Sequence, residues 1–163
     1  MVEYAQATSS TSEAHVEGFV RAYQEAFAGP PYFEDYSREQ VLEEIWFPHL
    51  SDGMTVLALD GSEVVGFGCA VPTAQAPSEV RDYLDEHGER AGLTFDHAAS
   101  WYMSELGVAE SHRLRGIGSQ LVKWRLRAIK SLGIDHYLFR TAAEGSNSIH
   151  LYKKIGATIM PEL

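Results

Sequence analysis

Residues 113–119, Arg-Leu-Arg-Gly-Ile-Gly-Ser, decide the fold of this 163-residue chain. They lie between a strand predicted over Trp101–Val108 and a helix predicted over residues 117–132. Two glycines at such a junction allow backbone N–H groups to approach a ligand, and the helix N-terminus adds about half a positive charge. The two arginines can pair with phosphate oxygens. The stretch therefore predicts a pyrophosphate site and a nucleotide-type cofactor.

The stretch differs from two common phosphate-binding motifs. It lacks the Gly-Lys-Ser/Thr of a Walker A loop, and Leu121 replaces the third glycine of the dinucleotide fingerprint. It does match the pattern Arg/Gln-x-x-Gly-x-Gly/Ala, with Arg113, Gly116 and Gly118 at the fixed positions. Short glycine patterns recur by chance, so the position between a strand and an amphipathic helix is the stronger indication.

The rest of the chain alternates between predicted strands and helices. We expect strands at residues 2–7, 54–59, 63–71, 101–108, 136–141 and 157–159, the second and third joined by a turn at Asp60-Gly61. We expect helices after capping boxes at Ser10-x-x-Glu13 and Ser37-x-x-Gln40, the second ending near Pro48, and after caps at Ser78 and Ser146. The order predicts an α/β (α+β) fold in one domain over residues 1–163: a mixed, mostly antiparallel sheet with helices on both faces.

The helix that follows the glycines has a predicted buried face. Its members are Ile117, Leu121, Trp124, Ala128 and Leu132. The strand before it and the strand after it form a parallel βαβ unit with this helix.

Composition and charge exclude several classes of protein. No apolar run is long enough to span a membrane, and a single cysteine, Cys69, fits a cytoplasmic protein without disulfides. The net charge of −10 argues against a nucleic-acid partner. Residues 113–154 carry nine Lys or Arg against two Asp or Glu, whereas the remainder carries four against 21. This distribution favours an anionic cofactor beside the glycine turn and, elsewhere, either a cationic co-substrate or simply solvated acidic faces.

These motifs together resemble the GCN5-related N-acetyltransferase (GNAT) family. The similarity extends along the order of elements and is sharpest over residues 104–121 and 147–157, where Asn147 precedes Leu151-Tyr152 and Gly156-Ala157. It implies a sheet with splayed central strands, acetyl-CoA as acyl donor and the acylation of amines. It also implies that the backbone of Leu106 and Val108 pairs with the pantetheine arm. The pyrophosphate would be held by Arg113, Leu114, Arg115, Gly116, Ile117, Gly118 and Ser119, and Asn147 would contact the cofactor arm.

The reaction that the resemblance implies needs a base, an acid and an oxyanion donor. Glu105 is the candidate base, because it lies three residues before Val108 on the strand expected to line the cleft. Strand alternation would point Glu105 and Gly107 to one face, unless a bulge resets it, and a surface carboxylate or a salt bridge is the alternative. Tyr152 is the acid that the resemblance implies, and a packing aromatic is the alternative. A backbone N–H near Val108 can serve the oxyanion. His97, beside Asp96, is an alternative base.

The histidines and the cysteine give no indication of a metal site or of a nucleophile. The seven histidines lack His-x-x-x-His spacing and a cysteine partner, so no metal site is expected. Cys69 lies in an apolar strand and is expected to be a buried thiol.

The aromatic and acidic segment Tyr32, Phe33, Glu34 and Asp35 falls where the family builds its acceptor pocket, and local packing is the alternative. The acceptor is expected to be a primary amine on a small cationic molecule. A peptide N-terminal or lysine acetyltransferase, and a non-catalytic acetyl-CoA sensor, remain alternatives. Because only seven residues follow Gly156, with Pro161 among them, the sheet edge is expected to be covered by a homodimer or by a chain continuing past Leu163.

Overall fold

The computed structural model describes residues 1–30, 32–88, 96–140 and 147–154, the side chains of 147–149 excepted. Its centre is a five-stranded sheet in the order β1-β2-β3-β4-β5. The first four strands pair antiparallel, and β4 and β5 pair parallel across the connection made by α5. The strands are β1 (Val2–Gln6), β2 (Met54–Asp60), β3 (Glu63–Pro72), β4 (Trp101–Val108) and β5 (Tyr137–Phe139).

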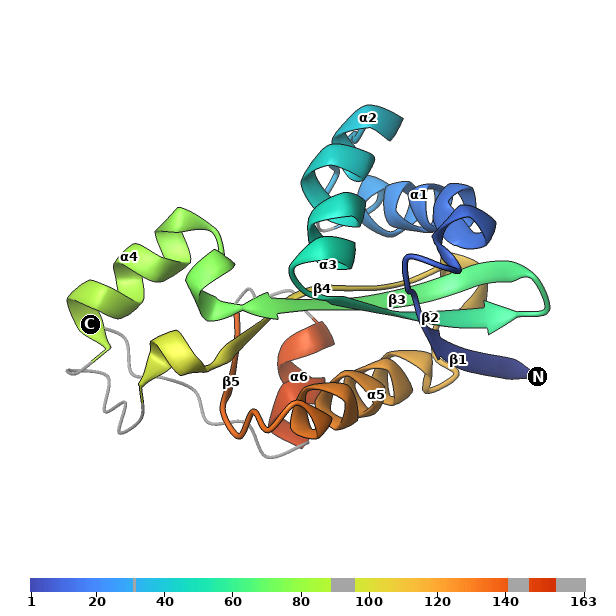
Figure 1. Cartoon of the computed structure of the whole chain (residues 1–163). Coiled ribbons are helices and arrows are strands. Elements are labelled where there is room, and N and C mark those ends of the chain that lie inside the picture. The colour runs from blue at the N-terminus through green and yellow to red at the C-terminus, as the bar shows by residue number, and fades with distance from the viewer. Residues whose placement is uncertain (31, 89–95, 141–146, 155–163) are drawn as a thin grey trace.

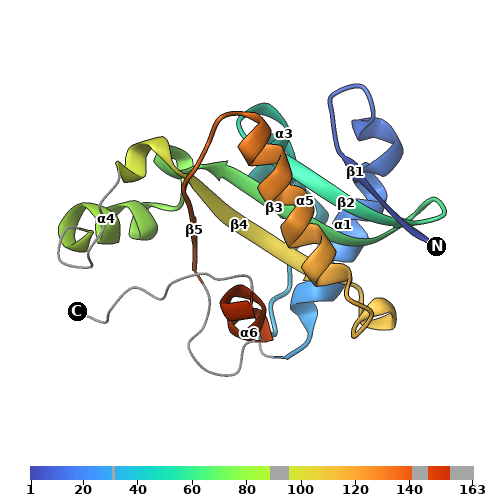
Figure 2. The same ribbon diagram turned by 90° about the horizontal axis from the view of Figure 1, so that it is seen from below.

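Helices cover both faces of the sheet (Figures 1 and 2). One face carries α1 and α3, and the other carries α5 and α6. The helices are α1 (Ser12–Ala28), α2 (Arg38–Gln40), α3 (Phe47–Ser51), α4 (Ser78–His87), α5 (Ile117–Ser131) and α6 (Asn147–Lys154). The mixed, mostly antiparallel α/β architecture predicted from the sequence is confirmed. The final strand expected at residues 157–159, and the cap at Ser146, lie outside the described residues.

The core on the α1 face is aromatic. Phe19 and Tyr23 of α1 pack against Phe67 of β3, with ring centroids 5.2 and 5.4 Å apart, and Trp46 closes the cluster from the next helical segment. These apolar side chains recur at helical spacing on α1 and face a strand whose alternate residues point the same way. Their burial fixes α1 across β3 and β4.

Two of the predicted caps are wrong, and one is confirmed. At Ser37 the capping box forms, since Gln40 N–H donates to Ser37 Oγ at 3.1 Å and Ser37 N–H donates to Gln40 Oε1 at 2.9 Å. Helix α1 instead begins after Thr11 without a side-chain cap, because the hydroxyls of Thr8, Ser10 and Thr11 bond one another in a turn. Helix α4 begins at Ser78 itself, after Pro77.

The second helical segment does not end at Pro48, contrary to expectation. It runs from α2 through a π-helical stretch, Val41–Trp46, into α3. A π-turn is wider than an α-turn, and it here directly precedes the turn that contains Pro48. Pro48 has no N–H to donate, and it lies in the first turn of α3, directly after the wide turn. The segment therefore continues one turn farther and carries His49 to the sheet.

The buried face of α5 also differs from the prediction. Trp124 and Leu132 are 37% and 59% exposed, and the buried residues are Ile117, Leu121, Val122, Arg125 and Ile129. Trp124 instead stacks on Tyr4 of β1, with ring centroids 6.1 Å apart. The face that meets the sheet is thus rotated toward Arg125, whose side chain is fully buried.

Candidate active site

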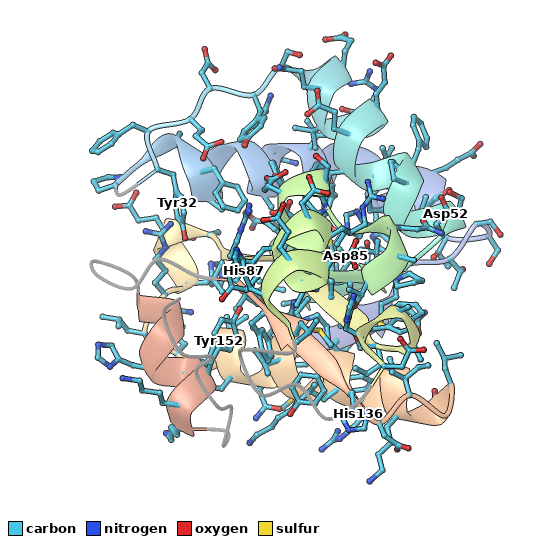
Figure 3. The ribbon with its side chains drawn as sticks, turned by 90° about the vertical axis from the view of Figure 1, so that its left-hand side faces the viewer. Tyr32, Asp52, Asp85, His87, His136 and Tyr152 are labelled. Carbon is cyan, nitrogen blue, oxygen red and sulfur yellow. The ribbon has the colours of Figure 1, made fainter. Side chains whose placement is uncertain are left out.

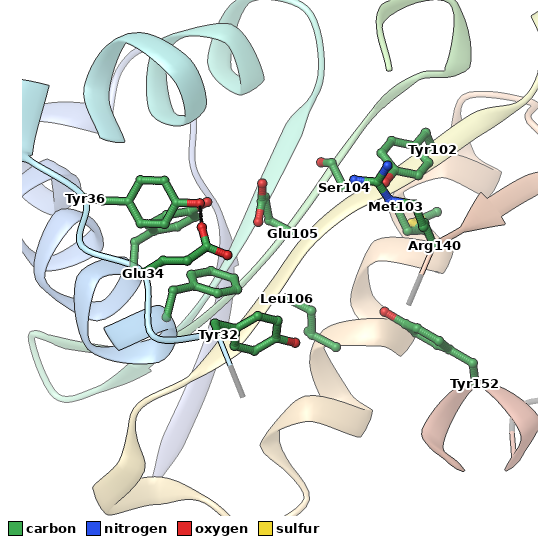
Figure 4. Close-up of a pocket in the computed structure, with 12 residues that line it drawn as sticks. Tyr32, Glu34, Tyr36, Tyr102, Met103, Ser104, Glu105, Leu106, Arg140 and Tyr152 are labelled. Carbon is green, nitrogen blue, oxygen red and sulfur yellow. Dashed lines mark hydrogen bonds between the residues drawn. The ribbon is translucent and has the colours of Figure 1, made fainter. Parts of the chain in front are cut away.

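The site forms where β4 separates from β5. The two strands pair only from Trp101 with Tyr137 to Met103 with Phe139. Beyond Met103, no strand of the described residues pairs with β4 on that side. A cavity of about 450 Å³ opens there (Figure 4). It is lined by Tyr23, Phe27, Tyr32, Glu34, Tyr36, Tyr102, Met103, Ser104, Glu105, Leu106, Arg140 and Tyr152.

Glu105 lies on the floor of this cavity and points toward α1 (Figure 4). Burial raises the pKa of its carboxyl to about 7, and the nearby Glu34 carboxylate acts in the same direction. A hydrogen bond with the Tyr23 phenol, and the charges of Arg125 and Arg140, lower this pKa in part. A carboxyl that titrates near neutrality can accept a proton from an ammonium group at physiological pH.

Tyr152 of α6 lies across the cavity from Tyr32 and Glu34 (Figures 3 and 4). Its ring packs against Phe139 of β5 with centroids 3.9 Å apart and the ring planes tilted by 33°, and the residue is only 8% exposed. Figure 4 shows the hydroxyl directed toward β4 at Leu106. The phenol is thus held at the point where the strands separate.

The loop after α1 forms the other wall of the cavity. Tyr32 and Glu34 line it, and Tyr36 donates a hydrogen bond to Glu34 (Figure 4). Burial, and after it this bond, raise the pKa of Tyr36 to about 12. Phe33 is 72% exposed, and neither Phe33 nor Asp35 lines the cavity. Half of the segment named from the sequence therefore reaches the site.

The glycine turn leads from the end of β4 into α5. Gly116 has a φ of 77°, in the left-handed region that favours glycine, and caps α5 without a side-chain hydrogen bond. The first N–H groups of the helix are therefore free of side-chain caps. A Cβ added at Gly118 would lie 3.9 Å from Leu151 of α6 and 4.0 Å from Val108 of β4, between the two elements that flank the opening.

Exposed cationic side chains flank this turn. Arg113 donates a hydrogen bond from Nε to the Val108 carbonyl at 3.1 Å, and Arg113 and Arg115 are both exposed. Leu114, between them, is fully exposed with a φ of 62°. The turn thus presents backbone N–H groups and two cations at the end of β4, the strand that lines the cavity with Leu106. Asn147 begins α6, but its side chain lies outside the described residues.

Arg125 crosses beneath the sheet and ties β3 to β4. Its Nη1 donates to the Cys69 carbonyl at 3.0 Å and to the Glu105 carbonyl at 3.1 Å. A Cβ at Gly68 would come within 3.0 Å of Arg125 Nε, so the glycine leaves room for the guanidinium. Nε and Nη2 have no hydrogen-bond partner among the described residues. Burial lowers the pKa of Arg125, and interaction with the Tyr152 phenol opposes that effect.

Several residues at this site were not anticipated from the sequence. They are Tyr23, His49, Ser104, Arg125 and Arg140. Arg125 alone had a readable signal, because it occupies the four-residue spacing of Ile117, Leu121 and Ile129. His97, the alternative base, bonds Asp85 at 3.1 Å and does not line the cavity. Cys69 is fully buried, and burial raises the pKa of its thiol to about 12.

Comparison with known families decides the class of the protein. The model of the acetyltransferase (GNAT) family matches residues 19–157. The chain belongs to the GNAT family. It is an acetyl-CoA-dependent N-acetyltransferase, as the resemblance indicated. No protein among the curated sequences matches it significantly. No helix in the described ranges has the length and apolarity that a membrane crossing requires.

Solved structures share the fold of this GNAT protein at low sequence identity. An aminoglycoside acetyltransferase, AAC(6')-Iy, in complex with the bisubstrate analogue CoA-S-monomethyl-acetylneamine, has a TM-score of 0.70 and 14% identity, with 100% of this chain and 95% of that chain covered. The aminoglycoside 6'-N-acetyltransferase AAC(6')-IG from Acinetobacter haemolyticus has a TM-score of 0.67 and 12% identity, with coverage of 100% and 94%. The ribosomal-protein-S18-alanine N-acetyltransferase from Escherichia coli has a TM-score of 0.63 and 11% identity, with coverage of 96% and 77%.

Proposed function

We propose that this acetyltransferase transfers the acetyl group of acetyl-CoA to a primary amine of a small cationic molecule, by direct attack in a ternary complex. The observation that carries the proposal is the pair Glu105 and Tyr152, which line one cavity at the separation of β4 and β5. A base and an acid are thereby present at the place where an extended thioester arm can enter beside β4.

The residues around the glycine turn fit acetyl-CoA. The free N–H groups at the start of α5, with Arg113 and Arg115, suit a pyrophosphate. The half of β4 that has left β5, with Leu106 and Val108, offers backbone groups to an amide-containing arm. Acetyl-CoA would supply an activated acetyl thioester at this position.

Glu105 would remove a proton from the acceptor ammonium. Its pKa of about 7 makes it largely ionised at slightly alkaline pH, and a proton transfer from an amine held within hydrogen-bond distance is then accessible. The neutral amine has the lone pair that attack on a carbonyl requires. Holding the amine beside the thioester contributes much of the remaining acceleration.

Tyr152 would protonate the departing sulfur. Its hydroxyl points toward β4, and the Arg125 cation interacts with it from beneath the sheet. A positive charge beside a phenol stabilises the phenolate left after proton donation. Arg125 would act here as a positioning residue, because it also fixes the backbone of Glu105.

The cavity supports a small acceptor. A volume of about 450 Å³ lies in the range of small-molecule pockets, roughly 300–1,000 Å³. Its lining includes the carboxyl groups of Glu34 and Glu105 and the guanidinium of Arg140. Arg140 forms a salt bridge with Glu79 at 3.2 Å, so its charge is already paired. Two carboxyl groups in a partly closed space favour a cationic amine. Solved aminoglycoside acetyltransferases of this fold add support, one of them being in complex with sisomicin.

We also propose that the protein is cytoplasmic and forms a homodimer.

An acceptor screen tests the proposal. Purified protein and acetyl-CoA are incubated with polyamines, amino sugars, simple alkyl amines and short peptides, and release of coenzyme A is followed. Turnover of small cationic amines above peptides is expected. Turnover of peptides alone would favour the peptide acetyltransferase. Binding of acetyl-CoA without transfer to any acceptor would favour a sensor.

A further inference from the structure

A β-bulge in β4 directs two neighbouring polar side chains into the cavity. Cys69 of β3 pairs with Glu105, and Val71 pairs with Tyr102, so the single residue Ala70 opposes both Met103 and Ser104. In a regular strand, Ser104 and Glu105 would point to opposite faces. The bulge resets this alternation, and Figure 4 shows Ser104 and Glu105 on the same side of β4.

His49 of α3 meets Ser104 on that side. The side chain of His49 is buried, with 5% of the residue exposed. Its Nδ1 lies 2.6 Å from the Ile45 carbonyl oxygen, and its Nε2 lies 2.6 Å from Ser104 Oγ. Burial lowers the pKa of the imidazole, which favours its neutral form.

These contacts determine which atom holds each proton. A carbonyl oxygen can only accept, so Nδ1 of His49 carries the single N–H of the neutral ring. Nε2 is then an acceptor, and Ser104 Oγ must donate its only proton to it. The Ser104 hydroxyl therefore turns lone pairs, and no proton, toward the cavity that it lines.

We propose that Ser104 is a specificity-determining residue, which accepts a hydrogen bond from a second donor group of the acceptor molecule, and that His49 positions it. The inference rests on the proposed function. Ser104 and Glu105 are adjacent residues that line the same cavity, so a small amine bound at Glu105 can place a neighbouring polar group beside Ser104. The favoured acceptor class is an amine with a neighbouring hydroxyl or ammonium group, such as an amino alcohol, an amino sugar or a vicinal diamine.

The test compares acceptors that differ only in this second donor. Wild-type protein is assayed with 2-aminoethanol against propylamine and with trans-2-aminocyclohexanol against cyclohexylamine, by release of coenzyme A. We expect kcat/KM to favour the hydroxylated member of each pair by on the order of ten- to a hundredfold, because an unpaired buried acceptor is costly. Ser104→Ala should remove this preference through KM for the hydroxylated amine, whereas Ser104→Thr, which keeps a hydroxyl, should restore it.

His49 variants and a remote control complete the design. His49→Gln keeps an acceptor for the Ser104 proton and should retain the preference, whereas His49→Leu should lose it. Ser131→Ala removes an exposed hydroxyl of α5 that bonds the Ala128 carbonyl, and should change nothing. Nitrogen NMR of His49 gives a readout besides activity: a neutral ring protonated at Nδ1, with an Nε2 signal that moves in Ser104→Ala.

The outcomes separate the two proposals. If wild type acetylates both members of each pair equally, and Ser104→Ala does the same, the role of Ser104 is refuted while the acetyltransferase function stands. An Nε2-protonated ring would refute the proton arrangement. If no amine in the set is acetylated, the proposed small-amine function falls, and the inference falls with it.

Discussion

Replacing Glu105 by Gln is expected to stabilise the folded protein at alkaline pH. The folded carboxyl keeps its proton up to about pH 7, whereas its ordinary pKa is 4.5. Between these pH values the folded state binds more protons than the unfolded chain, so stability falls as pH rises. At about 1.36 kcal/mol per pKa unit, the ionised carboxylate costs the folded state about 3 kcal/mol above pH 7. Gln has nearly the same shape and no charge to bury.

The measurement is urea unfolding of wild type and Glu105→Gln from pH 4.5 to 8.5. The difference in unfolding free energy should be small at the acidic end, grow through pH 5–7 and level off near 3 kcal/mol at pH 8. The same change at the exposed Glu110 controls for the loss of one carboxylate. In kinetics, Glu105→Gln should lose the rise of kcat/KM through pH 7 and fall about 10²- to 10⁴-fold at pH 8. A stability difference independent of pH would refute the raised pKa and remove the physical support for Glu105 as base.

Four further predictions address the other parts of the site. Tyr152→Phe should lower kcat by an order of magnitude or more with little change in acetyl-CoA affinity; equal loss of both would mean that the phenol only packs. Gly118→Val should abolish the rise in Tm that acetyl-CoA gives wild type by mass action, while Gly29→Ala, at an open helix end, keeps it; a full rise in Gly118→Val would show that the cofactor site is misplaced. For cationic acceptors kcat/KM should fall with ionic strength, and a preference for neutral or anionic acceptors without salt dependence would contradict the steering. Light scattering should give the mass of a dimer, and a monomer at every concentration would refute it.

The sequence was sufficient where local patterns and packing agree. The bounds of β4, the start of α5 and the capping box at Ser37 follow from short-range chemistry, and the structure has them as predicted. The glycine turn was located because a close backbone approach to a ligand requires glycine, and Gly116 and Gly118 lie at the junction of a strand and a helix. The alternation expected from Glu105 to Val108 holds, because the bulge lies before Glu105 in the sequence, at Met103 and Ser104.

The rest of the site depends on contacts between distant parts of the chain. Ser104 meets His49 across 55 sequence positions, and no periodicity predicts a bulge or a π-turn that brings them together. Arg125 was placed on no face of its helix, because a charged residue is rarely fully buried. Its position at the spacing of Ile117, Leu121 and Ile129 was visible, but the carbonyls of Cys69 and Glu105 that receive it were not.

The π-helical stretch before Pro48 determines which way His49 faces at the acceptor site. A wide turn accommodates one residue more than an α-turn, and each residue of an α-helix turns the following side chains by about 100°. If the same residues of Val41–Trp46 closed into α-turns, the extra residue would instead rotate the following side chains by about 100°, and His49 would turn away from Ser104. The Ser104 proton would then be released toward the cavity, and an acceptor of hydrogen bonds would become a donor. Substrate preference would thus be inverted by a change in helical geometry at Val41–Trp46, with every residue that touches the substrate left in place.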